Sequence, residues 1–186
     1  MRGHQGVPGL ARGDHVCGFY FGPEERDLLL RVILRAGRRA GAWCACVVDD
    51  DPDLVAARVR AELGAELVGD GGWFSMRGIT DEDRDATGFP EERMVEYLDA
   101  VAADAVDHDM SWVAGEMSHA LRRPDLVPQL LAHELEADAV IHGRPQAIVC
   151  LYDLELVGAG LLTELLRTHP KLLLGDVLVD NPAYAP

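Results

Sequence analysis

The chain has 186 residues, enough for one domain that buries roughly 70% of the surface its unfolded form exposes. Hydrophobic residues make up 48% and charged residues 26%, a composition that excludes disordered and fibrous proteins. Lys and Arg number 17 against 32 Asp and Glu, so the net charge at pH 7 is -15. Because so acidic a surface repels phosphate backbones, we expect no direct binding of nucleic acid.

The negative charge is concentrated in one segment. Residues 81–116 carry twelve Asp and Glu against two Arg, a net charge of −10, whereas residues 1–48 carry seven Arg against four acids, a net charge of +3. The acidic segment is either a solvated helix face or a surface that docks a basic partner protein.

The sequence also bears on cellular location. No run of residues is apolar over the length of a membrane span, and the N-terminal residues lack the apolar core of a signal peptide. We therefore expect a cytoplasmic protein with no membrane contact. Because the cytosol keeps thiols reduced and all the cysteines lie in apolar runs, we expect buried free thiols at Cys17, Cys44, Cys46 and Cys150.

The first predicted elements alternate between strand and helix. Apolar runs without polar alternation indicate buried strands, and Pro23 and Pro52 stand in the first turns of two helices that Gly41 and Gly64 end. In chain order the patterns predict strand 15–21, helix 22–39, strand 42–48 and helix 52–63.

The second half continues the alternation. Met94, Leu98, Val101 and Ala105 repeat at helical spacing and mark a long helix. The patterns predict strand 71–78, helix 90–109, strand 111–117, helix 124–141, strand 147–153, helix 158–168 and an edge strand over 171–179.

Continuous apolar strands that alternate with helices indicate an α/β protein. Its mostly parallel sheet is covered by helices on both faces, in three layers. No repeat or linker divides the chain, so we expect a flexible N-terminus over 1–12 and a single domain over 13–186.

In such sheets, ligands bind outside the carboxyl ends of the strands. The residues that the sequence places there are Tyr20, Phe21 and Gly22, Asp49 to Asp51, Glu116, Ser118 and His119, and Tyr152 with Asp153. Four polar residues would be costly to bury unpaired and must then bond to each other, to a ligand or to water: Glu116, His119, Glu134 and Asp153.

Residues 15–51 have the layout of a phosphate-loop ATPase core of the RecA-like, circadian-clock type. The turn at 21–27 holds one glycine, a proline without an amide proton and three carboxylates, so it cannot cradle a phosphate. We therefore expect a degenerate phosphate loop and no binding of ATP. Asp153 stands where such ATPases carry a metal-binding acid, but it is also placed to cap the turn after its strand.

Several short motifs follow one another along the chain: His15-Val16-Cys17-x-x-Tyr20, Gly115-Glu116-Met117, Glu134, Cys150-x-Tyr152-Asp153, His169-Pro170 and Asn181-x-x-Tyr184. In this order they resemble the motifs of the MEDS domain, a sensory domain of methanogen and methylotroph regulators. The resemblance covers about 13–184. It implies a RecA-like fold without a phosphate loop and a role in sensing small hydrocarbon derivatives or other small ligands, with His and Cys residues, here His15 and Cys17, among the binding groups.

Cofactors and catalysis receive little support. His15 and Cys17 share a strand face and could bind a metal or haem iron. A third ligand would have to come from His119, His169 or another cysteine, and none of these stands at chelating spacing, so no cofactor is expected. Cys44 and Cys46 also share a face, within what looks like packed core. None of the common hydrolase, metalloprotease or dinucleotide-binding motifs is present, and we expect no enzyme activity.

The leading hypothesis is a cytoplasmic sensory domain that binds a small organic ligand and regulates a partner signalling protein. The alternative is a protein-interaction scaffold without a ligand. A partner would dock on the acidic segment, or a second copy would pair with the strand at 171–179 to form a homodimer. The predicted ligand-binding residues are His15, Cys17, Tyr20, Glu116, His119, Tyr152 and Asp153.

Overall fold

The computed structural model describes residues 9–64, 72–80 and 89–185, which form a seven-stranded sheet flanked by helices. The strands are β1 (His15–Tyr20), β2 (Trp43–Val48), β3 (Phe74–Gly78), β4 (Ser111–Glu116), β5 (Gln146–Asp153), β6 (Lys171–Leu174) and β7 (Val177–Asp180). The helices are α1 (Gly22–Ala40), α2 (Pro52–Leu63), α5 (Glu91–Asp104), α6 (Ser118–Leu121), α7 (Val127–Ile141) and α8 (Ala159–Thr168).

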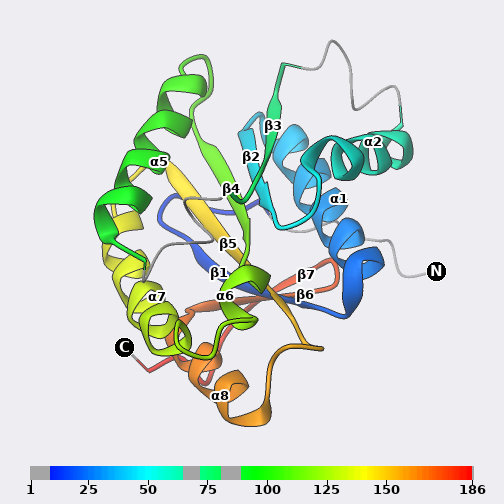
Figure 1. Ribbon diagram of the computed structural model, residues 1–186. Helices are drawn as coiled ribbons and strands as arrows, with labels where there is room; N and C mark the ends of the chain where they lie inside the picture. Colours follow the sequence, from blue (N-terminus) through cyan, green and yellow to red (C-terminus); the bar gives the residue numbers. More distant parts are fainter. Residues whose placement is uncertain (1–8, 65–71, 81–88, 186) are drawn as a thin grey trace, which may run out of the picture.

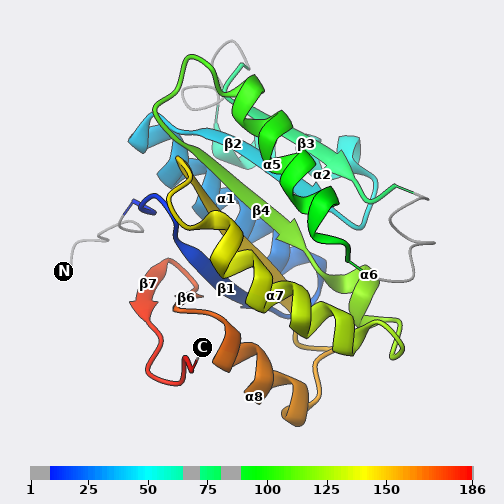
Figure 2. The same ribbon diagram turned by 90° about the vertical axis from the view of Figure 1, so that its left-hand side faces the viewer.

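The strand order in the sheet is β3-β2-β4-β5-β1-β6-β7, and all neighbouring strands are parallel except β6 and β7. Figure 1 shows α1 and α2 on one face of the sheet and α5, α7 and α8 on the other, and Figure 2 looks onto the second face. The predicted three-layer α/β architecture with a mostly parallel sheet is therefore confirmed.

Side-chain alternation along each strand divides the apolar interior into two cores. One core joins the sheet to α1 and α2 and contains Val16, Cys46 and Val149. The other joins the opposite face to α5, α7 and α8 and contains Cys17 and Cys150, which are Cα partners in neighbouring strands. All four cysteines are buried free thiols, as expected.

Local signals account for helix boundaries at both the carboxyl and the amino edge of the sheet. The Asp51 side chain accepts hydrogen bonds from the amides of Asp53 and Leu54 and so begins α2. Gly41, at φ 70°, takes the left-handed conformation that ends α1.

The prediction of a single edge strand over 171–179 is wrong. The run folds back as the hairpin β6–β7, because Gly175 adopts φ 62° at the turn between them. Of this run only β7, four residues long, lies at an edge of the sheet, and β3 forms the opposite edge.

Smaller differences concern element ends. Residues 124–126 lie in a turn before α7, α5 ends at Asp104, and the short helix α6 was not predicted. The expected flexible segment 1–12 lies mostly outside the described residues, and within it Leu10 packs in the core. Among the described residues, no helix combines the length and the apolar character that crossing a membrane requires.

Candidate functional site

The predicted ligand-binding residues do not gather at one place, because the sheet separates them. His15, Cys17 and Tyr152 belong to the face covered by α7 and α8. Tyr20 and Glu116 meet on the α1 side, at the carboxyl edge. Three neighbourhoods result: a polar network at the carboxyl edge, a cavity beneath α5, and a buried cluster beneath α7.

The carboxyl-edge network is centred on Glu116 at the end of β4. Its Oε1 accepts hydrogen bonds from the Tyr20 hydroxyl at 2.7 Å and the Ser118 hydroxyl at 3.1 Å, and its Oε2 accepts from the Asp49 amide at 2.9 Å. Burial and the negative charge of Glu116 raise the pKa of Tyr20 well above its ordinary value, so this phenol stays a donor.

Arg26 of α1 completes the network. Its side chain is 3% exposed and donates to Asp50 Oδ2 at 2.8 Å, to Asp27 Oδ1 at 2.9 Å and to Glu116 Oε2 at 3.4 Å. Although burial opposes the charged form, these carboxylates outweigh it and keep the guanidinium protonated. Arg26 thus pairs with three acids of this edge, and Arg58 and Arg122 pair in addition with Asp27 and Asp49.

The turn between β1 and α1 replaces a phosphate loop. The amide of Phe21 donates to Glu25 Oε2 at 2.8 Å, and the amide of Gly22 donates to Asp153 Oδ1 at 3.4 Å. Asp153 also accepts from the amide of Glu155 at 3.0 Å, which is the turn-capping role that the sequence allowed. Amides that would face a phosphate in an ATPase are here bonded to the protein's own carboxylates.

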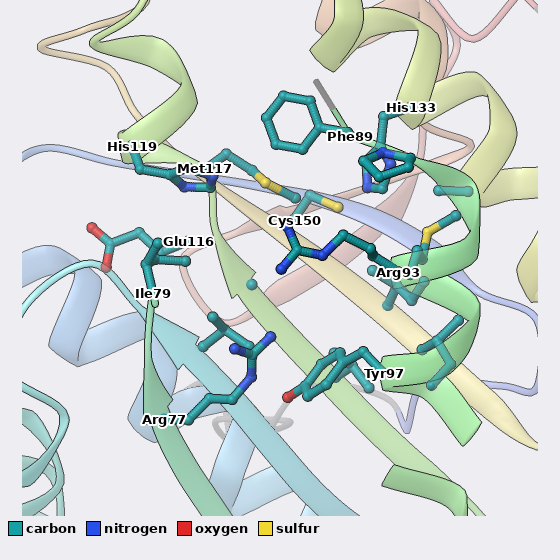
Figure 3. Close-up of a pocket in the computed structure, with 18 residues that line it drawn as sticks. Arg77, Ile79, Phe89, Arg93, Tyr97, Glu116, Met117, His119, His133 and Cys150 are labelled. Carbon is teal, nitrogen blue, oxygen red and sulfur yellow. The ribbon is translucent and has the colours of Figure 1, made fainter. Parts of the chain in front are cut away.

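The cavity lies between the sheet and helices α5 and α7 and has a volume of about 170 Å³. Its floor comes from β2, β4 and β5, and Gly115 contributes no side chain to it. Figure 3 shows that Glu116, at its margin, turns its carboxylate away from the cavity. The lining residues that bear on function are Arg77, Phe89, Arg93, Tyr97, His119 and His133.

Two cations extend into this largely apolar space. Arg77 of β3 and Arg93 of α5 point toward its centre in Figure 3. The Arg77 guanidinium lies 4.2 Å from the centre of the Tyr97 ring, a cation–π contact that fixes its direction. The Phe89 ring packs 5.3 Å from that of His133 and 5.8 Å from that of His119.

The buried cluster is centred on Glu134 of α7, which is fully buried. Glu134 Oε2 lies 3.1 Å from His15 Nε2, 3.2 Å from His169 Nε2 and 3.3 Å from Cys150 Sγ. Glu134 Oε1 accepts a short hydrogen bond from the Tyr152 hydroxyl. The cluster therefore joins β1, α7, β5 and the residue that follows α8.

Burial and the contacts around Glu134 shift the pKa values of the ionisable groups in the cluster. Burial opposes ionisation of Glu134, but the hydrogen bond from His15 and the charge of that imidazolium hold the pKa of Glu134 well below the usual range. Burial likewise opposes protonation of His15, yet the carboxylates of Asp138 and Glu134 raise its pKa to about 9. Burial and the Glu134 charge raise the pKa of the Cys150 thiol.

Sequence reasoning missed part of each neighbourhood. Cys150 shares a strand face with the selected Tyr152, and that spacing could have drawn attention to it. The sequence offered His169 only as a possible third metal ligand, because it stands at no chelating spacing from His15 or Cys17. The pairing of Arg77 with Tyr97 joins a strand to a helix and has no sequence signature at all.

Comparison with known proteins bears on both the family and the fold. The sequence profile of the MEDS family, the methanogen/methylotroph, DcmR sensory domain, matches residues 14–170. The chain belongs to the MEDS family. The expected family membership is thereby confirmed, and no curated protein sequence matches this MEDS domain.

Two solved structures resemble the MEDS domain in fold. A KaiC-like protein of Pyrococcus horikoshii, PH0186, superposes with a TM-score of 0.54 at 12% identity, over 87% of this chain and 70% of that one. A second protein of the same archaeon, PH0250, gives a TM-score of 0.56 at 13% identity, over 88% of this chain and 82% of that one. The expected RecA-like, KaiC-like fold is confirmed.

Proposed function

We propose that this MEDS domain is a non-catalytic sensor that binds a small organic molecule in the cavity beneath α5 and signals its occupancy to a partner protein. The cavity carries the proposal. Apolar walls with a few directed polar groups, set against the central strands of a sheet, are the usual architecture of a small-molecule site.

The lining indicates the class of molecule. The floor residues Val113 and Ile148 and the roof residue Met94 favour an apolar body, and the guanidinium groups of Arg77 and Arg93 favour a carboxylate or another electron-rich group. A compact, mostly apolar molecule with one anionic end fits both features.

Helix α5 is suited to report occupancy. Of its residues, only Leu98 and Val101 are buried, whereas Met94 and Tyr97 nearer its N-terminus roof the cavity and are partly buried. A ligand would add contacts there and favour one position of the helix, which is how binding shifts a conformational equilibrium. The opposite side of the helix exposes Glu92 and Glu96 to a basic partner.

The chemistry of the remaining residues supports a non-catalytic role. Glu116 is held by Tyr20, Ser118 and Arg26, and raised pKa values keep the buried thiols Cys17 and Cys150 protonated and poorly nucleophilic in the metal-free chain.

Binding is tested with benzoate, benzyl alcohol and toluene, three probes of similar size that differ in polarity. We expect methyl resonances of Val113, Ile148 and Met94 to shift on titration, with benzoate the strongest of the three. Hydrogen exchange of the α5 amides should slow when benzoate is bound, whereas exchange in α2 should not change.

A cavity-filling variant provides the control. A Cβ at Gly115 would have its nearest neighbour, Met117 Cε, 3.9 Å away, so Gly115→Leu can fill the cavity without backbone strain and should weaken benzoate binding at least about tenfold. Gly160→Leu on the exposed side of α8 should bind as the parent does. If none of the probes affects the cavity methyls, or if Gly115→Leu binds benzoate unchanged, the sensor proposal fails and the ligand-free scaffold is favoured.

A further inference from the structure

The cluster around Glu134 has a composition and a geometry that the sensor function does not require. One ligand atom from each of His15, Glu134, Cys150 and His169 lies within 4.8 Å of all the others, and all four residues are buried. These residues come from four separate elements and converge on one point.

The tautomer of His169 is fixed by its surroundings. Its Nδ1 lies 2.8 Å from the carbonyl oxygen of Leu165, which can only accept, so Nδ1 carries a proton. The Thr168 hydroxyl donates to the same carbonyl at 3.0 Å and is left to accept from Nδ1 at 2.9 Å. Neutral His169 therefore presents the bare lone pair of Nε2 to the cluster.

That lone pair faces a carboxylate. His169 Nε2 lies 3.2 Å from Glu134 Oε2 but forms no hydrogen bond, although the side chain is fully buried. Two electron-rich atoms held at this distance repel each other unless a cation lies between them. If Nε2 carried a proton, that proton would be expected to form a hydrogen bond with Glu134 Oε2. The relative orientation of the two side chains gives no such bond.

The groups that lie behind His15, His169 and Glu134 are of the kinds that orient metal ligands in proteins. His15 directs Nε2 inward while its Nδ1 lies 3.6 Å from Asp138 Oδ1, and His169 has a backbone carbonyl behind it. Metal-bound histidines characteristically have a carboxylate or carbonyl at the second ring nitrogen. Tyr152 similarly anchors Glu134 through Oε1 and leaves Oε2 directed at the centre.

We propose that His15 Nε2, His169 Nε2, Glu134 Oε2 and Cys150 Sγ bind one divalent transition-metal ion of the zinc type. Tetrahedral zinc with ordinary bond lengths separates such ligand atoms by about 3.3 to 3.6 Å. The distances from Glu134 Oε2 are 3.1, 3.2 and 3.3 Å, and Cys150 Sγ lies 3.6 Å from His15 Nε2. Four of the six separations between ligand atoms are thus close to the tetrahedral values, and the other two are at most 4.8 Å.

Charge balance agrees with a doubly charged ion. Binding displaces the thiol proton of Cys150 and the Nε2 proton of His15, and leaves one thiolate, one carboxylate and two neutral imidazoles around the ion, so the buried unit is neutral overall. Two imidazoles, one thiolate and one carboxylate match zinc better than the oxygen-seeking magnesium or calcium. Four protein ligands close the coordination sphere, as in structural zinc sites.

The proposal is tested on tag-free protein purified without chelators. We expect elemental analysis to find about one zinc per chain. After exchange into cobalt, the protein should show the visible bands of tetrahedral cobalt and a thiolate-to-cobalt charge-transfer band in the near ultraviolet. X-ray absorption at the zinc edge should find one sulfur and three nitrogen or oxygen neighbours.

Substitutions assign the ligands. Cys150→Ala should abolish the charge-transfer band, and His169→Gln should weaken cobalt binding at least about a hundredfold. The matched controls Cys46→Ala, a buried thiol on the other face of the sheet, and His142→Gln, an exposed histidine, should retain both the band and the affinity. Circular dichroism checks that each variant folds.

Three outcomes would overturn the site: a folded parent that takes up neither zinc nor cobalt, an absorption spectrum without a sulfur neighbour, or a Cys150→Ala variant whose cobalt spectrum is unchanged. If Cys150→Ala does not fold, the absorption measurement on the parent decides alone. Cys150 also lines the cavity, so the two proposals are distinguished by their readouts: the benzoate titration of the parent chain reports on the cavity, and zinc content and cobalt absorption report on the metal site.

Discussion

Tyr152 donates its hydroxyl proton to Oε1 of Glu134, so the other carboxylate oxygen, Oε2, is left to face two imidazoles and a thiol. Both residues are buried, and the contact ties the central strand β5 to helix α7. This hydrogen bond sets the direction of the carboxylate at the centre of the cluster.

Removing this hydrogen bond should loosen the proposed metal site without altering its ligands. We expect Tyr152→Phe to weaken cobalt binding about 10- to 100-fold, as other outer hydrogen bonds to metal ligands do, while the shape of the cobalt spectrum is kept. Competition with a chromophoric chelator measures the affinity. Tyr20→Phe, which removes a hydroxyl bonded to Glu116 instead, should leave it unchanged, and equal affinities for the two variants would contradict this role of Tyr152.

The turn at the end of β1 should not bind nucleotides. Its Phe21 and Gly22 amides are bonded to Glu25 and Asp153, and a phosphate there would meet carboxylates in place of donors. Calorimetric titration with ATP, with and without magnesium, should give no heat of binding. A micromolar dissociation constant would refute this interpretation of the turn.

The buried ion pairs of Arg26 should contribute more to the free energy of unfolding than an ion pair with an exposed partner does. Arg26→Met leaves the buried Glu116 without its cation and Asp27 with only the half-exposed Arg58, so we expect the free energy of unfolding to fall by about 3 to 5 kcal/mol. Urea denaturation measures the change. Arg31→Met on the same helix breaks a pair with the exposed Glu62 and should cost at most about 1 kcal/mol, and losses of similar size would show that burial is not the cause.

Two helical glycines should respond oppositely to alanine. A Cβ at Gly37 in α1 would overlap Cys44 Sγ and crowd the Trp112 ring, so Gly37→Ala should destabilise the protein by about 1 to 3 kcal/mol. A Cβ at Gly160 in α8 meets open space, so Gly160→Ala should stabilise by up to about 1 kcal/mol through helix propensity. Thermal unfolding compares them, and a stabilising Gly37→Ala would contradict the packing of α1 on β2.

Stability should decline at high pH because the tyrosines are harder to ionise in the folded chain. A hydrogen bond to Asp138, together with burial, raises the pKa of Tyr184 to about 12, and burial raises the pKa of Tyr20, Tyr97 and Tyr152. The unfolded chain loses these protons near pH 10, so stabilisation that is complete below about pH 10 is lost as the pH rises toward the folded values.

Ultraviolet absorption of tyrosinate measures this difference. At about pH 11 the folded chain should carry less tyrosinate than the chain in urea. Asp138→Asn should lower the pKa of Tyr184 toward its ordinary value, because the acceptor charge is removed. Identical titration curves for the folded and unfolded chains would show that the phenols are not protected.

The sequence alone determined the fold class, because continuous apolar strands separated by helices indicate a parallel sheet with two covered faces. It also showed that the turn after the first strand has a proline and three carboxylates in place of a glycine-rich phosphate loop, which is the basis for predicting that the turn binds no nucleotide. The spacing of His15 and Cys17 likewise placed both side chains on one face of their strand, since alternation is a property of the strand itself.

Only the tertiary structure decided which residues meet. The strand order places β5 between β4 and β1, so Cys150 lies beside Cys17. Helix α7 packs over these strands and places Glu134 in contact with Cys150. The same pleat sends Tyr20 and Glu116 to the opposite face from Tyr152, which divides residues that the sequence grouped together. The spacing of residues along an element fixes which face they share, whereas the packing of elements far apart in the chain depends on the order of strands and the placement of helices over them.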